Sequence, residues 1–229
     1  MTAEEGFEQV DGVRLVVDPA TFATWIRDVP GVVLPPDFDG IVGATGSWWP
    51  SPSGDPAPEP ARARPAVQSR VPPAAAASLA VQAAADVAIR LRLWGPDGTT
   101  VACVAVAGDL CASLARLERD EPDEDLPPRV EVALMPLGSA VAEVVRLIPA
   151  CPPRAEGIAA AGLHVEVVAT EDAVARWQDT WVGGGQRWRR VLPSGAEPGL
   201  RTEPCSLEDL AADLRYVLAG STGTPGRQQ

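Results

Sequence analysis

The sequence predicts an α+β protein with a central, largely antiparallel sheet and flanking helices. Within residues 87–107, two stretches of strand-like alternation flank a Gly-Pro-Asp-Gly turn, which predicts a β-hairpin. Residues 130–149 and 200–220 each run from a strand-like segment through a proline and a short polar turn into a helix-like segment. Since an arginine-bearing strand or hairpin precedes each of them, we expect a pseudo-two-fold repeat of a strand-strand-helix unit.

The hairpin is predicted from the residues on both sides of its turn. In segment 87–93, aliphatic residues alternate with Arg90 and Arg92, so the two sets of side chains point to opposite faces of a strand. The turn at 95–98 contains a proline that fixes one φ angle, an aspartate that can bond its own backbone, and a glycine that accepts a positive φ angle. The segment 99–107, rich in Val and Thr, then returns as the second strand.

The N-terminal part of the domain, residues 1–46, is expected to contain a strand at 12–17 followed by a helix. Asp18 is a typical N-cap, and Pro19 suits the first helical position, where its missing N–H costs nothing. Apolar side chains then recur on one stripe, at Phe22, Trp25 and Ile26.

Residues 47–73 are a Pro/Ala-rich segment whose composition predicts a flexible excursion. Trp48 and Trp49 within it have two interpretations: they pack onto the nearby body, or they form an exposed anchor for a partner. The main α+β domain is expected at 74–220, with its two repeats at 74–149 and 162–220 and a disordered tail at 221–229.

Hydrophobic spacing divides the main domain into further elements. A helix is expected at 74–85 from its Ala-rich composition, which has a high helix propensity. Further helices are expected at 108–117, 138–148, 170–182 and 206–220. Strands are expected at 130–134, 163–168, 187–192 and 200–203. The helix at 108–117 is predicted from the spacing of Leu110, Leu114 and Leu117. The helix at 170–182 is predicted from the stripe of Val174, Trp177 and Trp181.

The charge of the chain excludes some classes of function. The net charge is −12, and all nineteen basic residues are arginines, so phosphate-binding loops and Schiff bases that need lysine are excluded. Nucleic-acid binding is not expected, because an acidic chain repels phosphate unless it has a segregated basic face. The short basic run 186–190 is interpreted as a strand with solvated arginines. Without a signal region or an eighteen-residue apolar run, we expect a cytoplasmic protein with no membrane insertion.

No cofactor or metal site is predicted. The four cysteines are scattered, and the single histidine, His164, lies at no recognisable zinc-ligand spacing from them. The acidic run 118–125 is interpreted as a solvated loop because it lacks the spacing of a calcium loop. His164 and Glu166 are expected on one face of a strand, either as an acid–base pair or as solvent-side residues. Since no nucleophile accompanies them, we expect a protein that is not an enzyme.

The segments at 87–117, 130–149, 183–195 and 200–220 resemble the EspG family in their hairpin turn and apolar spacing. These are chaperone-like proteins associated with ESX (type VII) secretion in actinobacteria. The opening strand and helix at 13–26 are also similar, and the resemblance covers about 13–42 and 79–219. Family members usually have a longer helical segment where this chain has the Pro/Ala-rich excursion, and often a longer hairpin loop.

The resemblance implies a non-catalytic, cytosolic protein that binds helical secretion substrates of the PE/PPE kind for export. The partner-binding residues implied are Trp94, Gly95, Pro96, Asp97, Trp188, Leu207, Leu210 and Leu214. For the leucines of the last helix, the alternative is burial of the whole apolar stripe. The alternative function is an immunity-type or regulatory protein-binding module unrelated to secretion.

Overall fold

The computed structural model describes residues 12–29, 34, 38, 71–96, 98–118, 129–150, 161–171, 174–184, 187–193 and 201–221. The pair Trp48 and Trp49, most of the Pro/Ala-rich segment, the acidic run after Glu118, Asp97 of the hairpin turn and the tail from residue 222 lie outside these residues.

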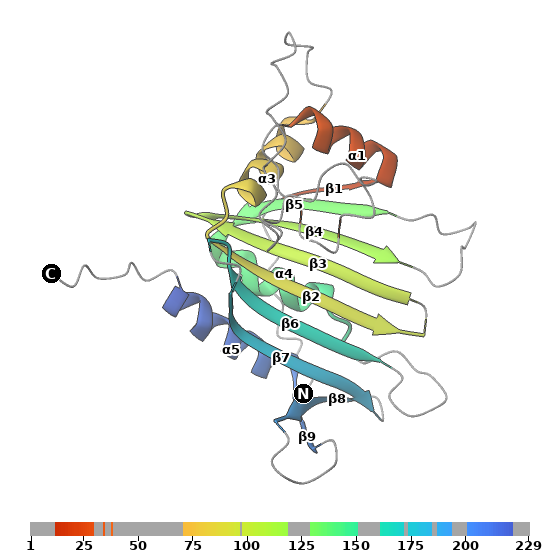
Figure 1. Cartoon of the computed structure of the whole chain (residues 1–229), viewed down its shortest axis with the longest axis vertical. Helices are drawn as coiled ribbons and strands as arrows, with labels where there is room; N and C mark the ends of the chain where they lie inside the picture. The colour runs from red at the N-terminus through yellow and green to blue at the C-terminus, as the bar shows by residue number, and fades with distance from the viewer. Residues whose placement is uncertain are drawn as a thin grey trace, which may run out of the picture.

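The described residues form a nine-stranded antiparallel sheet in the order β1-β5-β4-β3-β2-β6-β7-β8-β9 (Figure 1). Its strands are β1 (Val13–Val17), β2 (Val87–Gly95), β3 (Gly98–Ala107), β4 (Leu110–Glu118), β5 (Val130–Pro136), β6 (Gly162–Ala169), β7 (Ala175–Gly184), β8 (Arg187–Leu192) and β9 (Arg201–Pro204). The helices are α1 (Pro19–Asp28), α3 (Pro73–Ala83), the short 3-10 helix η2 (Leu137–Ser139), α4 (Ala140–Leu147) and α5 (Leu207–Ser221). The predicted α+β class and antiparallel sheet are confirmed.

The sheet consists of two meanders that meet at β2 and β6. Strands β2 to β5 follow one another in space and lead into η2 and α4, and strands β6 to β9 lead in the same way into α5. Apart from β1, the strand order is therefore symmetric about the β2–β6 pair, and α4 and α5 contact each other on one face. Each unit contains four strands and a helix, two strands more than the predicted unit.

The segment after Gly108 is a strand, β4, and not the predicted helix. It pairs along its length with β3 and β5, and Gly108 has a φ angle of 60°, which suits the tight turn from β3. Leu110 and Leu114 are four residues apart, a spacing that fits one face of a strand as well as one face of a helix. Since β4 is buried on both faces, no polar alternation marks it as a strand.

The segment predicted as a helix from Val174 is also a strand, β7. It pairs with β6 and β8, and Trp177 and Trp181 point to the same sheet face because their separation of four is an even number. Gly183 and Gly184 belong to the strand and pair with Trp188 and Arg187. These two glycines thus lie at the end of β7 that leads towards β8.

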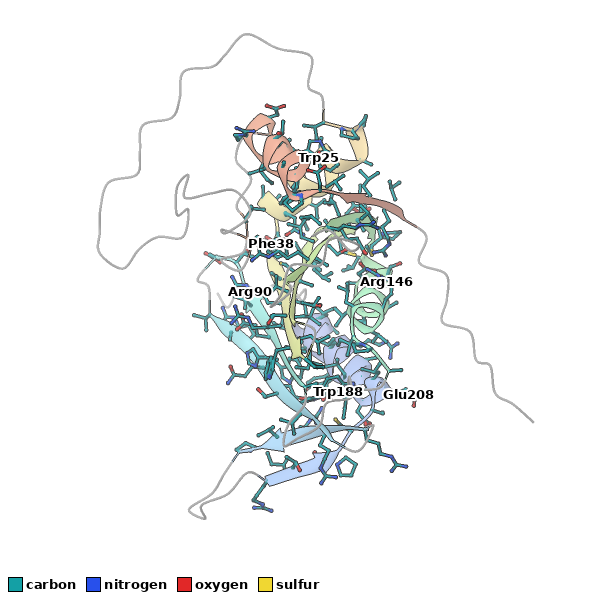
Figure 2. The ribbon with its side chains drawn as sticks, turned by 90° about the vertical axis from the view of Figure 1, so that its right-hand side faces the viewer. Trp25, Phe38, Arg90, Arg146, Trp188 and Glu208 are labelled. Atoms are coloured by element: carbon teal, nitrogen blue, oxygen red, sulfur yellow. The ribbon has the colours of Figure 1, made fainter. Side chains whose placement is uncertain are left out.

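Helices cover the two faces of the sheet unequally. On one face α4 and α5 enclose the larger core, which includes Ile89, Val165 and Trp181 (Figure 2). On the other face α1 and α3 enclose a second core, in which Phe22 and Leu79 have no exposed surface. Helix α3 packs on β3, β4 and β5, which all belong to the first meander.

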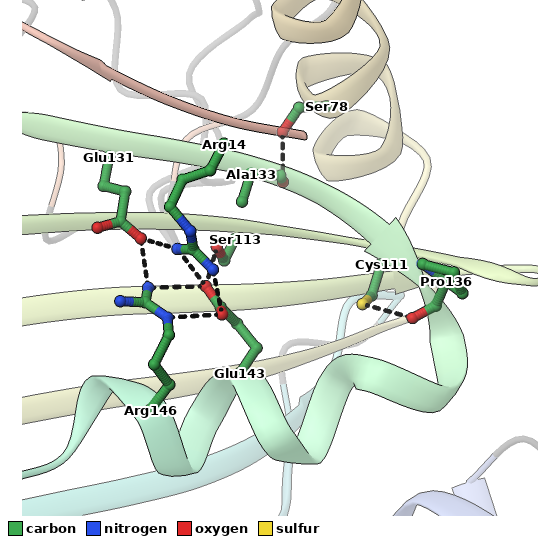
Figure 3. A network of polar contacts seen from close by, with 9 residues as sticks. All are labelled: Arg14, Ser78, Cys111, Ser113, Glu131, Ala133, Pro136, Glu143 and Arg146. Atoms are coloured by element: carbon green, nitrogen blue, oxygen red, sulfur yellow. Dashed lines mark hydrogen bonds and ion pairs between the residues drawn. The ribbon is translucent and has the colours of Figure 1, made fainter. Parts of the chain in front are cut away.

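A buried carboxylate fixes α4 to the sheet (Figure 3). Glu143 has no exposed surface and accepts hydrogen bonds from Arg14 of β1 at 2.7 Å, Arg146 at 2.9 Å and Ser113 of β4 at 2.6 Å. Both arginines also contact Glu131 of β5. Burial alone raises the pKa of Glu143, but these donors outweigh it and lower the pKa from 4.5 to about 2.

Candidate binding surface

The second meander exposes one face of its strands. On the side opposite to α4 and α5, the described helices lie over the first meander and none lies over β6 and β7 (Figure 2). We call this region the open face, defined by the side chains of Arg90, Arg92, Trp94, His164, Glu166, Gln178, Thr180, Val182 and Arg189 together with the backbone of Gly162.

The strand register places these residues in three cross-strand rows. Directly opposed residues of antiparallel strands share a sheet face and lie about 5 Å apart. The rows are Arg90–Glu166–Gln178, Arg92–His164–Thr180 and Trp94–Gly162–Val182, the last continuing to Arg189. The open face thus combines charged, polar and aromatic side chains from strands that are far apart in the sequence.

Trp94 is the large aromatic residue of the open face. Its side chain is 38% exposed and lies against the Cα of Gly162, where an added Cβ would come within 2.1 Å of the Trp94 Cζ2 atom. The glycine therefore provides the space in which the indole ring lies across β6. Because one side of the ring is supported by the sheet, its exposed side is held in a fixed position.

The polar residues of the open face are paired across strands. The Arg90 Nη1 atom lies 3.2 Å from the Glu166 Oε1 atom, and the His164 Nδ1 atom lies 3.0 Å from the Thr180 hydroxyl oxygen. Each member of the alternative acid–base pair thus has a partner on a neighbouring strand. In the described part of the chain, no group of three or more His, Cys, Asp or Glu residues is placed to hold a metal ion.

One of the comparisons with known proteins agrees with this architecture. No protein-family model and no curated protein matches the sequence. Among solved structures, the chain is similar to the Mycobacterium tuberculosis type VII secretion system chaperone EspG5, solved in complex with a PE25–PPE41 dimer. The match has a TM-score of 0.52 at 11% sequence identity and covers 90% of this chain and 96% of the other. The fold is EspG-like.

The EspG-like fold separates the predicted partner-binding residues into two groups. Trp94 and Gly95 end strand β2 beside the open face, Pro96 follows in the turn, and Asp97 lies outside the described residues. The others face the opposite side of the sheet and line the larger core; they are Trp188, Leu207, Leu210 and Leu214.

The second group is therefore part of the interior of the EspG-like fold. Leu210 and Leu214 have no exposed surface, Leu207 is partly buried, and Trp188 is 2% exposed. The Trp188 indole N–H donates to the carbonyl of Pro149 at 3.0 Å, and its ring centroid lies 6.3 Å from that of Trp181. The alternative interpretation of the last helix, burial of its whole apolar stripe, describes the leucines correctly. We therefore leave these four residues out of the proposed surface.

Several residues of the open face were not expected from the sequence. Gln178, Thr180 and Val182 were missed because β7 was predicted as a helix, which separates residues that alternate on a strand. The signal that was available is the alternation of these three with Trp177, Asp179 and Trp181.

Within the described residues, no helix is long and apolar enough to cross a membrane.

Proposed function

We propose that this protein is a non-catalytic, cytoplasmic binding protein for type VII secretion, which binds helical substrates of the PE/PPE kind before export. The observation that carries the proposal is the similarity to EspG5 over most of both chains. In addition, no described helix covers the open face of the second meander. EspG5 itself was solved with a PE25–PPE41 dimer.

The geometry of the open face supports a binding role. A fixed, partly exposed tryptophan is the type of side chain that contributes most to protein interfaces, because it covers a large apolar area at a small entropic cost. Trp94 has this position, next to the hairpin turn at Pro96. The residues around it are polar, among them the pairs Arg90–Glu166 and His164–Thr180, and a polar surround is typical of the rim of an interface.

The test is co-expression with a PE–PPE pair encoded in the same gene neighbourhood, followed by affinity purification and size-exclusion chromatography. We expect the pair to co-purify with the wild type. Trp94→Ala should weaken binding about thirtyfold, the effect of removing an interface hot spot. Tyr216→Ala is the matched control, because Tyr216 is an aromatic residue that is 83% exposed on α5, on the other face of the sheet.

The proposal fails if no PE–PPE pair of the neighbourhood binds, or if Trp94→Ala and Tyr216→Ala have the same effect. Binding to a globular toxin, with secretion unchanged when the gene is deleted, would favour the immunity-type alternative. Circular dichroism of each variant shows whether the fold is kept.

A further inference from the structure

The two edge strands of the sheet differ in composition (Figure 1). Strand β9 has two charged residues and ends in a proline, which cannot donate a backbone hydrogen bond. Charged residues and proline on an edge strand oppose pairing with a further strand. Strand β1, at the other edge, has four aliphatic residues and one arginine, Arg14. The β9 edge is therefore protected against strand addition, whereas the composition of β1 favours it.

The charge of Arg14 does not protect the β1 edge, because it is compensated within the chain. Arg14 donates to Glu143 of α4 at 2.7 Å and also contacts Glu131 of β5. Arg146 contacts the same two carboxylates, so the formal charges of two arginines and two glutamates cancel. A strand that approaches β1 thus meets a locally neutral cluster on the α4 side of the sheet.

The outer side of β1 is open in the part of the chain that the structure describes. All five residues of β1 pair with β5 on the inner side, and only that strand shares backbone hydrogen bonds with them. An antiparallel strand has N–H and C=O groups on both of its edges, so those on the outer edge are available to a second strand. Val13 and Val16, on opposite faces of the sheet, are 50% and 53% exposed.

The sequence of β1 is complementary to itself. A two-fold axis through Leu15, perpendicular to the sheet, pairs β1 with a second copy so that Leu15 opposes Leu15, Val13 opposes Val17 and Arg14 opposes Val16. All five residues are then paired and no like charges oppose each other. An axis through Arg14 would oppose two arginines, and an axis through Val16 would pair only three residues of the strand.

We propose that the outer edge of β1 pairs with β1 of a second copy of this chain, in a two-fold dimer whose sheet continues through both copies. Two five-residue strands make an interface below the standard size, so we expect a weak dimer with a dissociation constant of about 10 μM. The dimer does not depend on the proposed function, because the open face lies on other strands of the sheet.

Size-exclusion chromatography with light scattering, on the full chain at a series of concentrations, tests the dimer. The mass should rise from one chain towards two around 10 μM, on the order estimated for a small interface. Val16→Arg places a guanidinium opposite Arg14 of the second copy, twice in each dimer, and should weaken association about tenfold. Within its own chain the new side chain opposes Glu131, so the fold should be kept. Val174→Arg is the matched control, because Val174 is 49% exposed directly before β7.

Cysteine cross-linking tests the register. Opposed Cα atoms of antiparallel strands lie about 4.5–5.5 Å apart, a distance that a disulfide can span. Leu15→Cys should therefore form more disulfide-linked dimer on mild oxidation than the wild type with its four native cysteines. Val13→Cys is the control: Val13 opposes Val17, so the Val13 Cα atoms of the two copies lie about 13 Å apart and should give no additional cross-link.

A wild type that stays monomeric at all concentrations would overturn the inference, as would equal effects of Val16→Arg and Val174→Arg. Equal cross-linking of Leu15→Cys and Val13→Cys would refute the register and the paired strands with it. A monomeric wild type whose complex with a PE–PPE pair is weakened by Val16→Arg would overturn the dimer in favour of a strand from the partner. Dimers that form only after removal of residues 1–11 would overturn it in favour of a strand from the chain's own N-terminal residues.

Discussion

At the scale of single residues, the pair of Trp94 and Gly162 shows how the smallest residue can position the largest side chain. Glycine usually weakens a strand because it has no side chain to pack. Here the indole ring of Trp94, on the neighbouring strand, occupies the space that a side chain at residue 162 would fill. Gly162 therefore contributes to the surface by allowing Trp94 to lie across β6. A search for functional residues by chemical type overlooks such a position.

Gly162→Ala tests this arrangement. The new Cβ overlaps the indole ring, so Trp94 must leave β6, while alanine is the better strand residue. These effects oppose each other, and we expect a net change in stability below about 1 kcal/mol. The indole N–H signal of Trp94 in NMR spectra should move strongly. Gly138→Ala is the control, because no atom lies within 4 Å of its added Cβ. An unmoved Trp94 signal would refute the packing described.

The Glu143 carboxylate gives a second prediction at this scale. Glu143→Gln keeps the shape but removes the charge between Arg14 and Arg146, and it should cost about 3 kcal/mol at neutral pH. The folded pKa lies below the ordinary value of 4.5, so the stabilisation is complete above that pH and is lost as pH falls towards 2.

Urea unfolding at a series of pH values measures this contribution. The difference between the wild type and Glu143→Gln should be largest at neutral pH and shrink below pH 4.5. A difference that stays constant down to pH 2 would mean that the charge of Glu143 has no role in attaching α4.

At the scale of elements, the helices could be predicted from sequence and two of the strands could not. The helix α1 begins where Asp18 caps it, with the Thr21 N–H donating to the aspartate at 2.9 Å. Helix α3 lies where the Ala-rich composition predicted a helix, and α4 and α5 lie where apolar spacing predicted them. Strands β4 and β7 were missed because leucines or tryptophans four residues apart satisfy a helical stripe and a strand face equally well. Pairing partners, which decide between the two, lie outside any local window.

Leu214→Ala distinguishes the structural role of α5 from a binding role. Leu214 has no exposed surface in the core between α5 and the sheet, so its truncation should lower the free energy of unfolding by about 2–5 kcal/mol. Leu110→Ala is the control, because Leu110 is 38% exposed at the start of β4 and should cost less than about 1 kcal/mol. Urea denaturation compares them. Similar values for both variants would place α5 away from the core.

At the scale of the whole molecule, the class of fold could be predicted and the binding surface only in part. The hairpin of β2 and β3 and the alternation in β6 are local, and they sufficed for an antiparallel α+β protein. Trp94 was expected at a partner surface, whereas the rest of the open face depends on register and on which face the helices cover. Both are tertiary properties. The basic run 186–190 illustrates this, because only the strand pairing places Arg189 in the same cross-strand row as Val182, Gly162 and Trp94.

The symmetric strand order has a consequence for how the chain holds together. Without the second meander, β2 would be an exposed edge strand with unpaired backbone groups, and α4 would lose its contacts with α5. The same holds for β6 and α5 without the first meander. Each meander thus supplies the strand and the helix that the other needs at its edge. We therefore expect the two meanders, joined by the β2–β6 pairing, to unfold together.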